Sequence, residues 1–389
     1  MKFNFDQVVD RRHTNSIKYD MATYAKAIDV LPLWVADMDF KAPPCVEEAL
    51  LRRTQHGVFG YSESGAHYFK VLQNWFKRRH NWNIEQEWMI KTPGIVNAIH
   101  VAILALTAEE DGVLIQPPVY HPFASAVRKT GRRLVENELI YEKNRYQIDF
   151  NDFEQKIVQE GVKMFVLCSP HNPVGRVWTK DELTKMGEIC LCHGVVVVAD
   201  EIHQDFVYQG HKHLIFAAQN PSYSDIAITC TAPSKTFNLA GLPLSNIFIS
   251  NAFMREKFLR EYKRIGLSHV GVMGIVACQA AYENGDVWLE ELLRYLAGNI
   301  LFINEFLEER LPQVKMVNPE GTYLAWLDFN ALGFGRDELE AVIADKARLW
   351  LNSGELFGTG GAGFQRLNAA CPRSMLQEAM DRLCSAIHL

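Results

Sequence analysis

Short apolar runs alternate with helix-period stretches through the middle of the chain. Residues 112–117, 163–168 and 194–199 are rich in apolar side chains, and polar or aromatic residues follow each run. Between the second and third runs, Thr179 and Glu182 form a capping-box pattern that predicts the start of a helix. Apolar strands that alternate with helices are typical of a parallel sheet covered by helices on both faces. The pattern therefore predicts an α/β fold.

Further segments extend this architecture. The apolar runs 225–230 and 244–250 are predicted to add strands to the same sheet. Apolar residues recur at helical spacing from 64 to 80, which predicts an amphipathic helix. Residues 98–106 are almost entirely apolar, so we expect a helix that is buried on all sides.

The pattern changes after residue 285. A long amphipathic helix is predicted over 286–311, and strands and helices then follow in mixed order. We expect a large domain over residues 46–285, built on a mostly parallel central sheet. A smaller α+β domain is expected from residues 1–45 together with 286–389.

Composition narrows the class of protein. The chain has 389 residues, of which 48% are hydrophobic, so it can bury more than one large core. The formal net charge is −6 and no basic stripe is visible, so we expect no nucleic-acid partner. The longest apolar run, 270–282, is shorter than the roughly 20 residues that span a bilayer, and the first residues lack the apolar core of a signal peptide. We therefore expect no membrane association and a cytoplasmic location.

The eight cysteines are scattered along the chain, several of them inside apolar runs. Such residues behave as small hydrophobic side chains, so we expect them to be reduced. Cys190 and Cys192 have no second pair at the spacing of a zinc site. No metal site is therefore expected.

Polar side chains follow four of the predicted strands. They are Tyr120, Asn172, Asp200 and Lys235. Ligands of open α/β sheets bind beyond the carboxyl ends of the strands, so these side chains are expected to meet there. An amine, a carboxylate, an amide and an aromatic ring suit pyridoxal 5′-phosphate: the amine can bond its aldehyde, the carboxylate can keep its ring nitrogen protonated, and the aromatic ring can stack on it. The sequence thus predicts a pyridoxal 5′-phosphate site.

Several motifs carry a resemblance to a known family. The segments 169–175 (SPHNPVG), 199–203 (ADEIH) and 232–241 (APSKTFNLAG) resemble the class I/II aminotransferase superfamily, which has fold type I of the pyridoxal-phosphate-dependent transferases. Two others, 34–40 (WVADMDF) and 118–123 (PVYHPF), are similar to the MalY/PatB-like branch of cysteine-sulfur β-lyases. Together these motifs occur in the expected order along nearly the whole chain.

The resemblance assigns roles around the cofactor ring. It makes Lys235 the lysine that bonds the cofactor and Asp200 the partner of the pyridine nitrogen. Asn172 and His203 would face the phenolic oxygen, and Tyr120 would stack on the ring. Aspartate-aminotransferase-like members usually carry tyrosine at the position of His203, so this residue fits the β-lyase branch.

The resemblance also assigns a phosphate site. Gly94, Ile95 and Val96 lie at the start of a predicted helix, where backbone N–H groups bind anions. Ser234 and Thr231 are candidate hydroxyl donors to the same phosphate.

Three further positions follow from the resemblance. Pro243 stands where aminotransferases carry a phosphate-binding arginine. Tyr61 resembles a tyrosine that reaches in from a second subunit to the phosphate, where it would help to bind the cofactor, and this implies a homodimer with the active site at the subunit interface. Arg366 resembles the arginine that binds the α-carboxylate of an amino-acid substrate, with Tyr120 and Asn172 beside it. A guanidinium group binds a carboxylate through two parallel hydrogen bonds.

The glycine-rich segment 358–363 matches the spacing G-x-G-x-x-G. A dinucleotide-binding fingerprint opens a helix, whereas a strand-like segment is predicted after these glycines. We therefore interpret them as a loop that lets the backbone bend close to Arg366.

Three functions remain open from the sequence. The first is β-elimination of an S-substituted L-cysteine such as L-cystathionine to a thiol, pyruvate and ammonia. Lys235 would remove the Cα proton, and Lys235 or Tyr61 would protonate the departing sulfur. The second is amino transfer between an L-amino acid and a 2-oxo acid, which needs the same Lys235, Asp200 and Arg366. The third, permitted by the resemblance, is a regulatory protein that keeps the fold and binds a transcription factor.

Overall fold

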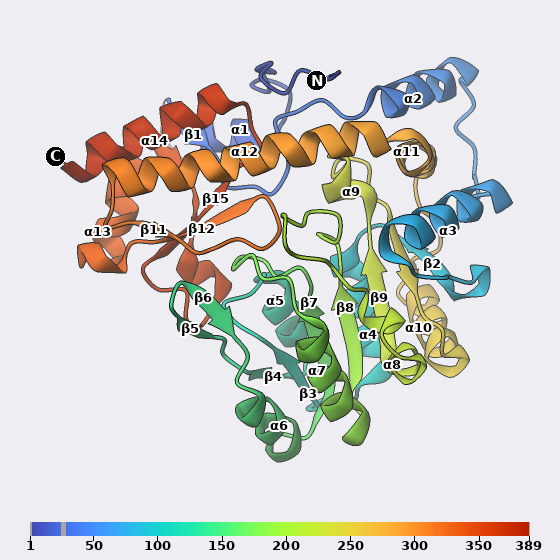
Figure 1. The fold of residues 1–389 in the computed structure, drawn as a ribbon. Helices are drawn as coiled ribbons and strands as arrows, with labels where there is room; N and C mark the ends of the chain where they lie inside the picture. Colours follow the sequence, from blue (N-terminus) through green and yellow to red (C-terminus); the bar gives the residue numbers. More distant parts are fainter. Residues whose placement is uncertain (1, 25–28, 389) are drawn as a thin grey trace.

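A seven-stranded sheet forms the centre of the molecule (Figure 1). The computed structural model describes residues 2–24 and 29–388. From one edge to the other, the strands are β2 (Met89–Thr92), β10 (Ser245–Phe248), β9 (Ala227–Thr231), β8 (Val196–Asp200), β7 (Val162–Cys168), β3 (Gly112–Ile115) and β4 (Arg133–Glu136). The pairs from β9 to β4 are all parallel, which confirms the predicted mostly parallel sheet.

The direction of β10 was not predicted correctly. The run 244–250 was expected to continue the parallel pattern, but β10 pairs antiparallel with both β2 and β9. A parallel neighbour needs a crossover that returns the chain to the other end of the sheet. Between β9 and β10 the chain forms only the four-residue helix α9 (Pro233–Thr236), so it turns back at the carboxyl end of β9.

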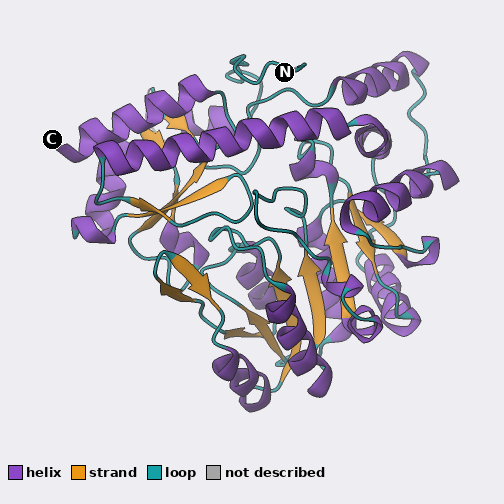
Figure 2. Ribbon diagram, in the orientation of Figure 1, coloured by secondary structure: helices purple, strands orange, loops and turns teal. Residues whose placement is uncertain are grey.

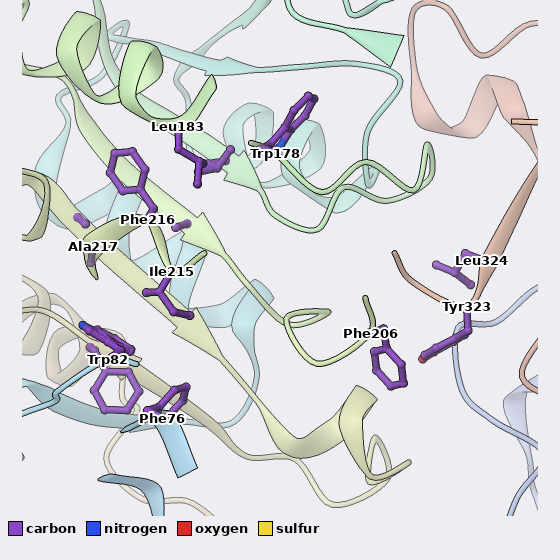
Figure 3. Packing of buried hydrophobic residues seen from close by; sticks show 14 of the residues in the cluster. Phe76, Trp82, Trp178, Leu183, Phe206, Ile215, Phe216, Ala217, Tyr323 and Leu324 are labelled. Atoms are coloured by element: carbon purple, nitrogen blue, oxygen red, sulfur yellow. The ribbon is translucent and has the colours of Figure 1, made fainter. Parts of the chain in front are cut away.

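Helices cover both faces of this sheet. One core cluster joins one face to α4 (Ile95–Leu106), α5 (Pro122–Lys129) and α10 (Ala252–Arg264). The other face belongs to a larger cluster with α3 (Ala66–His80), α6 (Phe150–Gln159), α7 (Lys180–Cys192) and α11 (Val272–Asn284), part of which Figure 3 shows. The capping box of α7 is present: the Glu182 backbone N–H donates to Thr179 Oγ1 over 3.2 Å, and the Thr179 N–H donates to Glu182 Oε2 over 2.7 Å.

The C-terminal part has its own sheet and core cluster. Its four strands, all paired antiparallel, are β11 (Lys315–Met316), β12 (Leu324–Asp328), β15 (Phe364–Asn368) and β14 (Asn352–Ser353). Helices α12 (Asp286–Arg310) and α14 (Arg373–His388) lie side by side over it (Figure 2), and α13 (Arg336–Ala341) completes this part. The long predicted helix over 286–311 is thus confirmed as α12.

The N-terminal segment contacts both parts of the molecule. Its strand β1 (Leu31–Pro32) pairs in parallel with β13 (Leu349–Trp350), next to the C-terminal sheet. Phe5 and Phe40, in contrast, pack in the larger cluster against the ring of Tyr295. The boundaries predicted at residues 45 and 285 remain predictions.

Some elements gave no clear signal in the sequence. They are α1 (Ile17–Tyr24), α2 (Pro44–His56), α8 (Pro221–Ile226), β2 and the hairpin of β5 (Ile140–Glu142) and β6 (Arg145–Gln147). The hairpin strands have three residues each, too few to establish a period. Within the described ranges, no helix combines the length and apolar character that crossing a membrane requires.

Residues 34–40, which we call the strap, run between the two parts of the molecule. The Asn238 side chain, just after α9, donates to the carbonyl oxygens of Met38 (3.0 Å) and Phe40 (2.8 Å) and accepts from the Met38 N–H (2.9 Å). From the other side, Asn368 Nδ2 donates to the carbonyl oxygens of Val35 and Asp37, both over 2.6 Å. Two amide side chains therefore fix the backbone of the strap.

Buried ion pairs add to this attachment. Lys18 is fully buried, and its Nζ lies 2.7 Å from Asp39 Oδ2. Arg11 contacts Asp37 Oδ2 over 2.6 Å and Asp39 Oδ1 over 2.8 Å. Removing one member would leave a buried charge without its partner, which is costly. The acidic side chains of the strap are therefore structural.

We predict that Asn238→Ala destabilises the protein by more than Asn81→Ala does. Both residues have positive φ, 57° and 50°, but Asn81 is an exposed C-cap of α3. Asn81→Ala places in left-handed backbone a residue that adopts this conformation less readily than asparagine does, and changes little else. Asn238→Ala also removes three hydrogen bonds to the strap, so we expect an additional loss of about 2 kcal/mol in the free energy of unfolding. Urea unfolding at fixed protein concentration measures both; equal losses would contradict the role assigned to Asn238.

Candidate active site

A cavity of about 400 Å³ opens where the carboxyl ends of the central strands meet the strap and β15. Ten of the twelve predicted site residues line it; Thr231 and Tyr61 do not. The cavity therefore brings together residues from positions 34 to 366 of the chain. Its position agrees with the rule that open α/β sheets bind ligands beyond their strand ends.

Lys235 lies on α9, directly after β9, and reaches into this cavity. Its Nζ donates a hydrogen bond of 2.7 Å to the carbonyl oxygen of Ala36 in the strap. Burial lowers the pKa of Lys235 to about 8, because the charged ammonium is poorly solvated there. A substantial fraction of the amine is thus neutral slightly above neutral pH, as a nucleophile or a general base requires.

Asp200 is the last residue of β8 and is buried. Its Oδ1 accepts a hydrogen bond of 3.2 Å from the Ile202 N–H, and no ion pair joins it to a cation of the described residues. Burial raises the pKa of Asp200 to about 7. A buried carboxyl group of this kind suits a protonated ring nitrogen, which would supply the missing positive charge.

His203 and Asn172 present polar atoms beside Asp200. His203 is buried, and burial lowers its pKa well below the usual range, so the imidazole is neutral. Its Nδ1 has no hydrogen-bond partner among the described residues. Asn172 Oδ1 accepts from Arg366 Nη1 over 3.0 Å, which leaves the Asn172 Nδ2 as the donor available to a ligand. Tyr120, fixed by its N–H to the Asn172 carbonyl (3.0 Å), supplies an aromatic wall.

Arg366 lies in the middle of β15 and is surrounded by neutral acceptors. Besides Asn172, its guanidinium donates to the Trp34 carbonyl (2.8 Å) and to Asn352 Oδ1 (2.5 Å), and it lies 4.9 Å from the centre of the Phe357 ring. Burial lowers its pKa to about 10, so the group stays charged at neutral pH. A buried cation without an anionic partner favours a carboxylate ligand. Segment 358–363 leads into β15 and not into a helix, which confirms the rejection of a dinucleotide fingerprint.

A second part of the cavity lining is suited to an anion. Gly94 is the N-cap of α4, and Ile95 and Val96 form its first turn, where backbone N–H groups are free. Ser234 also lines the cavity, as predicted. Thr231 instead donates its hydroxyl to the Asn246 carbonyl over 3.0 Å, inside the sheet.

Two further residues concern the predicted phosphate site and the predicted dimer: Ser245, which the sequence did not indicate, and Tyr61, which it did. Ser245 lines the cavity and was missed, because the run that contains it was expected to be parallel. In the observed antiparallel strand, Ser245 begins β10 beside the carboxyl end of β9. Tyr61 lies outside the cavity of its own chain, on the segment between α2 and α3, with 98% of its surface exposed.

Other residues around the site could not be recognised in the sequence. Asn352 and Phe357 hold Arg366 but belong to no motif. Tyr323 donates its hydroxyl to the Ala36 carbonyl over 2.9 Å, the same oxygen that accepts from Lys235. The acceptor is a backbone atom, so no side-chain pattern points to it.

We predict that Asp200→Asn changes the pH dependence of stability in the cofactor-free protein. The pKa of Asp200 is raised in the folded state, so this group favours folding below its unfolded pKa and loses that contribution as pH rises toward 7. Asparagine does not titrate. From pH 5 to pH 8, urea unfolding should show the variant gaining up to about 3 kcal/mol relative to the parent.

Glu320→Gln is the matched control for this experiment. Burial opposes ionisation of the buried Glu320, but the charge of Arg176 and hydrogen bonds from Val177, Arg176 and Arg145 lower its pKa overall. Arginine does not titrate between pH 5 and pH 8, so the Glu320 carboxylate and its partners keep their charges over the whole range. This variant should be destabilised without gaining stability toward pH 8. The same pH trend in both variants would contradict the assignment for Asp200.

Comparisons with known proteins agree with this geometry. A family model described as aminotransferase class I and II matches residues 28–383. Cystathionine beta-lyase PatB of Bacillus subtilis (strain 168) is 43% identical and covers 99% of this chain and 100% of PatB. Protein MalY of Escherichia coli (strain K12) is 34% identical, with 99% of each chain covered. The crystal structure of cystalysin from Treponema denticola, which contains pyridoxal 5′-phosphate, has a TM-score of 0.97 and 38% identity, covering 100% of this chain and 99% of that one. The chain therefore has the predicted fold-type-I architecture and belongs to the aminotransferase class I and II family.

Proposed function

We propose that this protein is a pyridoxal-phosphate-dependent carbon–sulfur lyase that cleaves S-substituted L-cysteines, such as L-cystathionine, to a thiol, pyruvate and ammonia. One observation carries the proposal: a single cavity combines Lys235, Asp200 and Arg366 in a chain that is 43% identical to a cystathionine beta-lyase along its whole length. Lys235 and Arg366 provide a base and a carboxylate site, which both this reaction and amino transfer require. The likeness to PatB favours elimination.

The residues present fit the cofactor. Asp200 would face the pyridine nitrogen, and the unpartnered Nδ1 of His203 and the free Nδ2 of Asn172 offer polar contacts for the phenolic oxygen. Tyr120 would cover the ring face. The phosphate would bind the N–H groups at the start of α4 together with the hydroxyls of Ser234 and Ser245. When bound, the cofactor supplies an electron-accepting ring that stabilises negative charge at the substrate Cα.

The chain's own residues would then perform the remaining tasks. Arg366 would hold the α-carboxylate, which orients the substrate before any bond breaks. Lys235 would remove the Cα proton as its neutral amine. The Cβ–S bond then breaks, sulfur leaves with the bonding electrons, and Lys235 or Tyr61 of a second subunit supplies its proton. Water completes the release of pyruvate and ammonia.

We predict that the purified protein, loaded with pyridoxal 5′-phosphate, releases pyruvate and ammonia in equal amounts from L-cystathionine without any 2-oxo acid. Lys235→Ala should abolish this release because the base is lost, while Lys180→Ala, an exposed lysine at the start of α7, should leave it unchanged. Pyruvate, ammonia and thiol are assayed separately. Turnover that requires an added 2-oxo acid would contradict the proposal and identify an aminotransferase, the alternative that the family description favours.

The proposal includes a homodimer in which Tyr61 enters the site of the other subunit. Tyr61 is 98% exposed in its own chain, and the nearby Val58 and Phe59 are 63% and 55% exposed. Adjacent exposed apolar side chains mark surfaces that bind other proteins. A second copy of the chain would bury them, and it would bring a phenol to the cavity.

We predict that Tyr61→Ala and Lys235→Ala each lose most of their activity alone, because every site then lacks either a phosphate contact or the base, and that a mixed dimer of the two recovers activity. A chain with Tyr61→Ala keeps its own Lys235, and a chain with Lys235→Ala can supply Tyr61, so each mixed dimer contains one intact site. Co-expressed and separated by two affinity tags, such dimers should recover about half of the wild-type activity per dimer, because one of two symmetric sites is intact. The matched control pairs Lys235→Ala with Arg366→Ala, two residues of the same cavity, and should recover none. Equal activity in both mixtures would contradict a shared site.

A further inference from the structure

One backbone oxygen beside the site accepts two hydrogen bonds. The carbonyl oxygen of Ala36 accepts from Lys235 Nζ over 2.7 Å and from the Tyr323 hydroxyl over 2.9 Å. A carbonyl oxygen has two lone pairs, so these two donors use its full capacity. The free amine of Lys235 and the phenol of Tyr323 therefore share a single acceptor.

Tyr323 is held rigidly in this position. Its side chain is fully buried just before β12, and its ring packs edge-on against Phe206 (4.9 Å between ring centres) and His203 (5.8 Å). Figure 3 shows Tyr323 beside Phe206 in the core. Burial raises the pKa of the Tyr323 phenol above its usual range, so the hydroxyl keeps its proton. Tyr323 is thus a constant neutral donor to the Ala36 oxygen.

This arrangement suits a lysine that alternates between two partners. While the cofactor engages the amine of Lys235, the Ala36 oxygen still has Tyr323 as its donor. No buried acceptor is then left unpaired, a state that would be costly. When the amine is released, the second lone pair of the same oxygen is available, 2.7 Å from the Nζ position seen here.

The shared acceptor also affects the charge on the amine. The hydroxyl hydrogen of Tyr323 carries a partial positive charge and points at the Ala36 oxygen. The ammonium form of Lys235 would donate to the same oxygen, so the two donors compete for it. A hydrogen bond that stabilises the charged ammonium raises the pKa of an amine, so weakening that hydrogen bond lowers the pKa. The other groups that act on Lys235 are Asp37 and Asp200, which favour the ammonium, and Arg366, which disfavours it; His203 is neutral. Tyr323 is the neutral donor that contacts the same oxygen.

We propose that Tyr323 is a positioning residue for Lys235: its hydroxyl keeps the Ala36 carbonyl in place as the resting acceptor for the free amine and weakens that acceptor for the ammonium form. The inference rests on the proposed function in one respect, the use of Lys235 as a base. The contact itself exists whichever reaction follows.

The test compares Tyr323→Phe with the parent in the cofactor-free, full-length protein. Competitive acetylation across a pH series, read by peptide mass spectrometry, reports the protonation of Lys235 itself. Loss of the competing donor should move the titration of Lys235 to higher pH by about half a pH unit to one pH unit, the scale of one neutral hydrogen bond. In the loaded enzyme, the rising limb of the pH profile for pyruvate release should move in the same direction.

Tyr208→Phe is the matched control. Tyr208 is half-buried and donates its hydroxyl to the carbonyl of Thr322 over 2.7 Å, one residue before Tyr323. Its removal deletes a hydroxyl from the same region but does not alter the Ala36 oxygen. We expect the titration of Lys235 to stay unchanged in this variant. An equal movement in both variants would overturn the inference, because it would reflect a general loosening of the core.

A second substitution keeps the test decisive if Tyr323→Phe does not fold. Site-specific replacement of Tyr323 by 3-fluorotyrosine keeps the ring and strengthens the hydroxyl as a donor, so the titration of Lys235 should move to lower pH. An unmoved titration in a folded Tyr323 variant would overturn the inference and leave Tyr323 a purely structural residue. Failure to release pyruvate without a 2-oxo acid would overturn the proposed lyase function but would not affect the acetylation result.

Discussion

The strap is the constraint on which the site depends, because its backbone joins the two cationic groups of the cavity. Lys235 follows β9 of the central sheet, and Arg366 lies on β15 of the C-terminal sheet. Both donate to strap carbonyls, Lys235 to that of Ala36 and Arg366 to that of Trp34. Asn238 and Asn368 hold the same seven residues from the two sides. The relative position of the proposed base and the proposed carboxylate site is thus set by one short segment.

The cavity differs from the rest of the core in how its charged groups are compensated. Burial lowers the pKa of Lys235 and of Arg366 and raises that of Asp200, so each group is shifted toward its neutral form. In the structural pairs the charges are compensated directly, as between Lys18 and Asp39. A ligand with a protonated ring nitrogen and a carboxylate would supply the charges that the cavity lacks. This difference distinguishes charges that stabilise the fold from charges that bind.

The sequence predicted the parts of the site that depend on local patterns. Side chains at the ends of buried strands or just beyond them, such as Asp200 and Lys235, could be placed because parallel strands end at one edge of a sheet. The direction of β10 could not be predicted in this way, since an apolar run has the same appearance in either orientation, and Ser245 was missed with it. Tyr323 and Asn352 were missed because they act on groups remote in sequence. The fold was therefore more predictable than the contacts that orient its reactive groups.

The strap holds Lys235 and Arg366 through backbone oxygens, which affects how the residues of the cavity can change between related proteins. Val35 and Ala36 are among the residues that line the cavity, while the carbonyl oxygens of Trp34 and Ala36 hold Arg366 and Lys235. Substituting the side chain of Val35 or Ala36 changes a residue of the cavity lining and leaves both oxygens in the chain. In the proposed enzyme, substrate range and catalytic alignment would therefore be encoded by different atoms of the same residues. Specificity in this part of the cavity could then change by single replacements without a compensating change at Lys235.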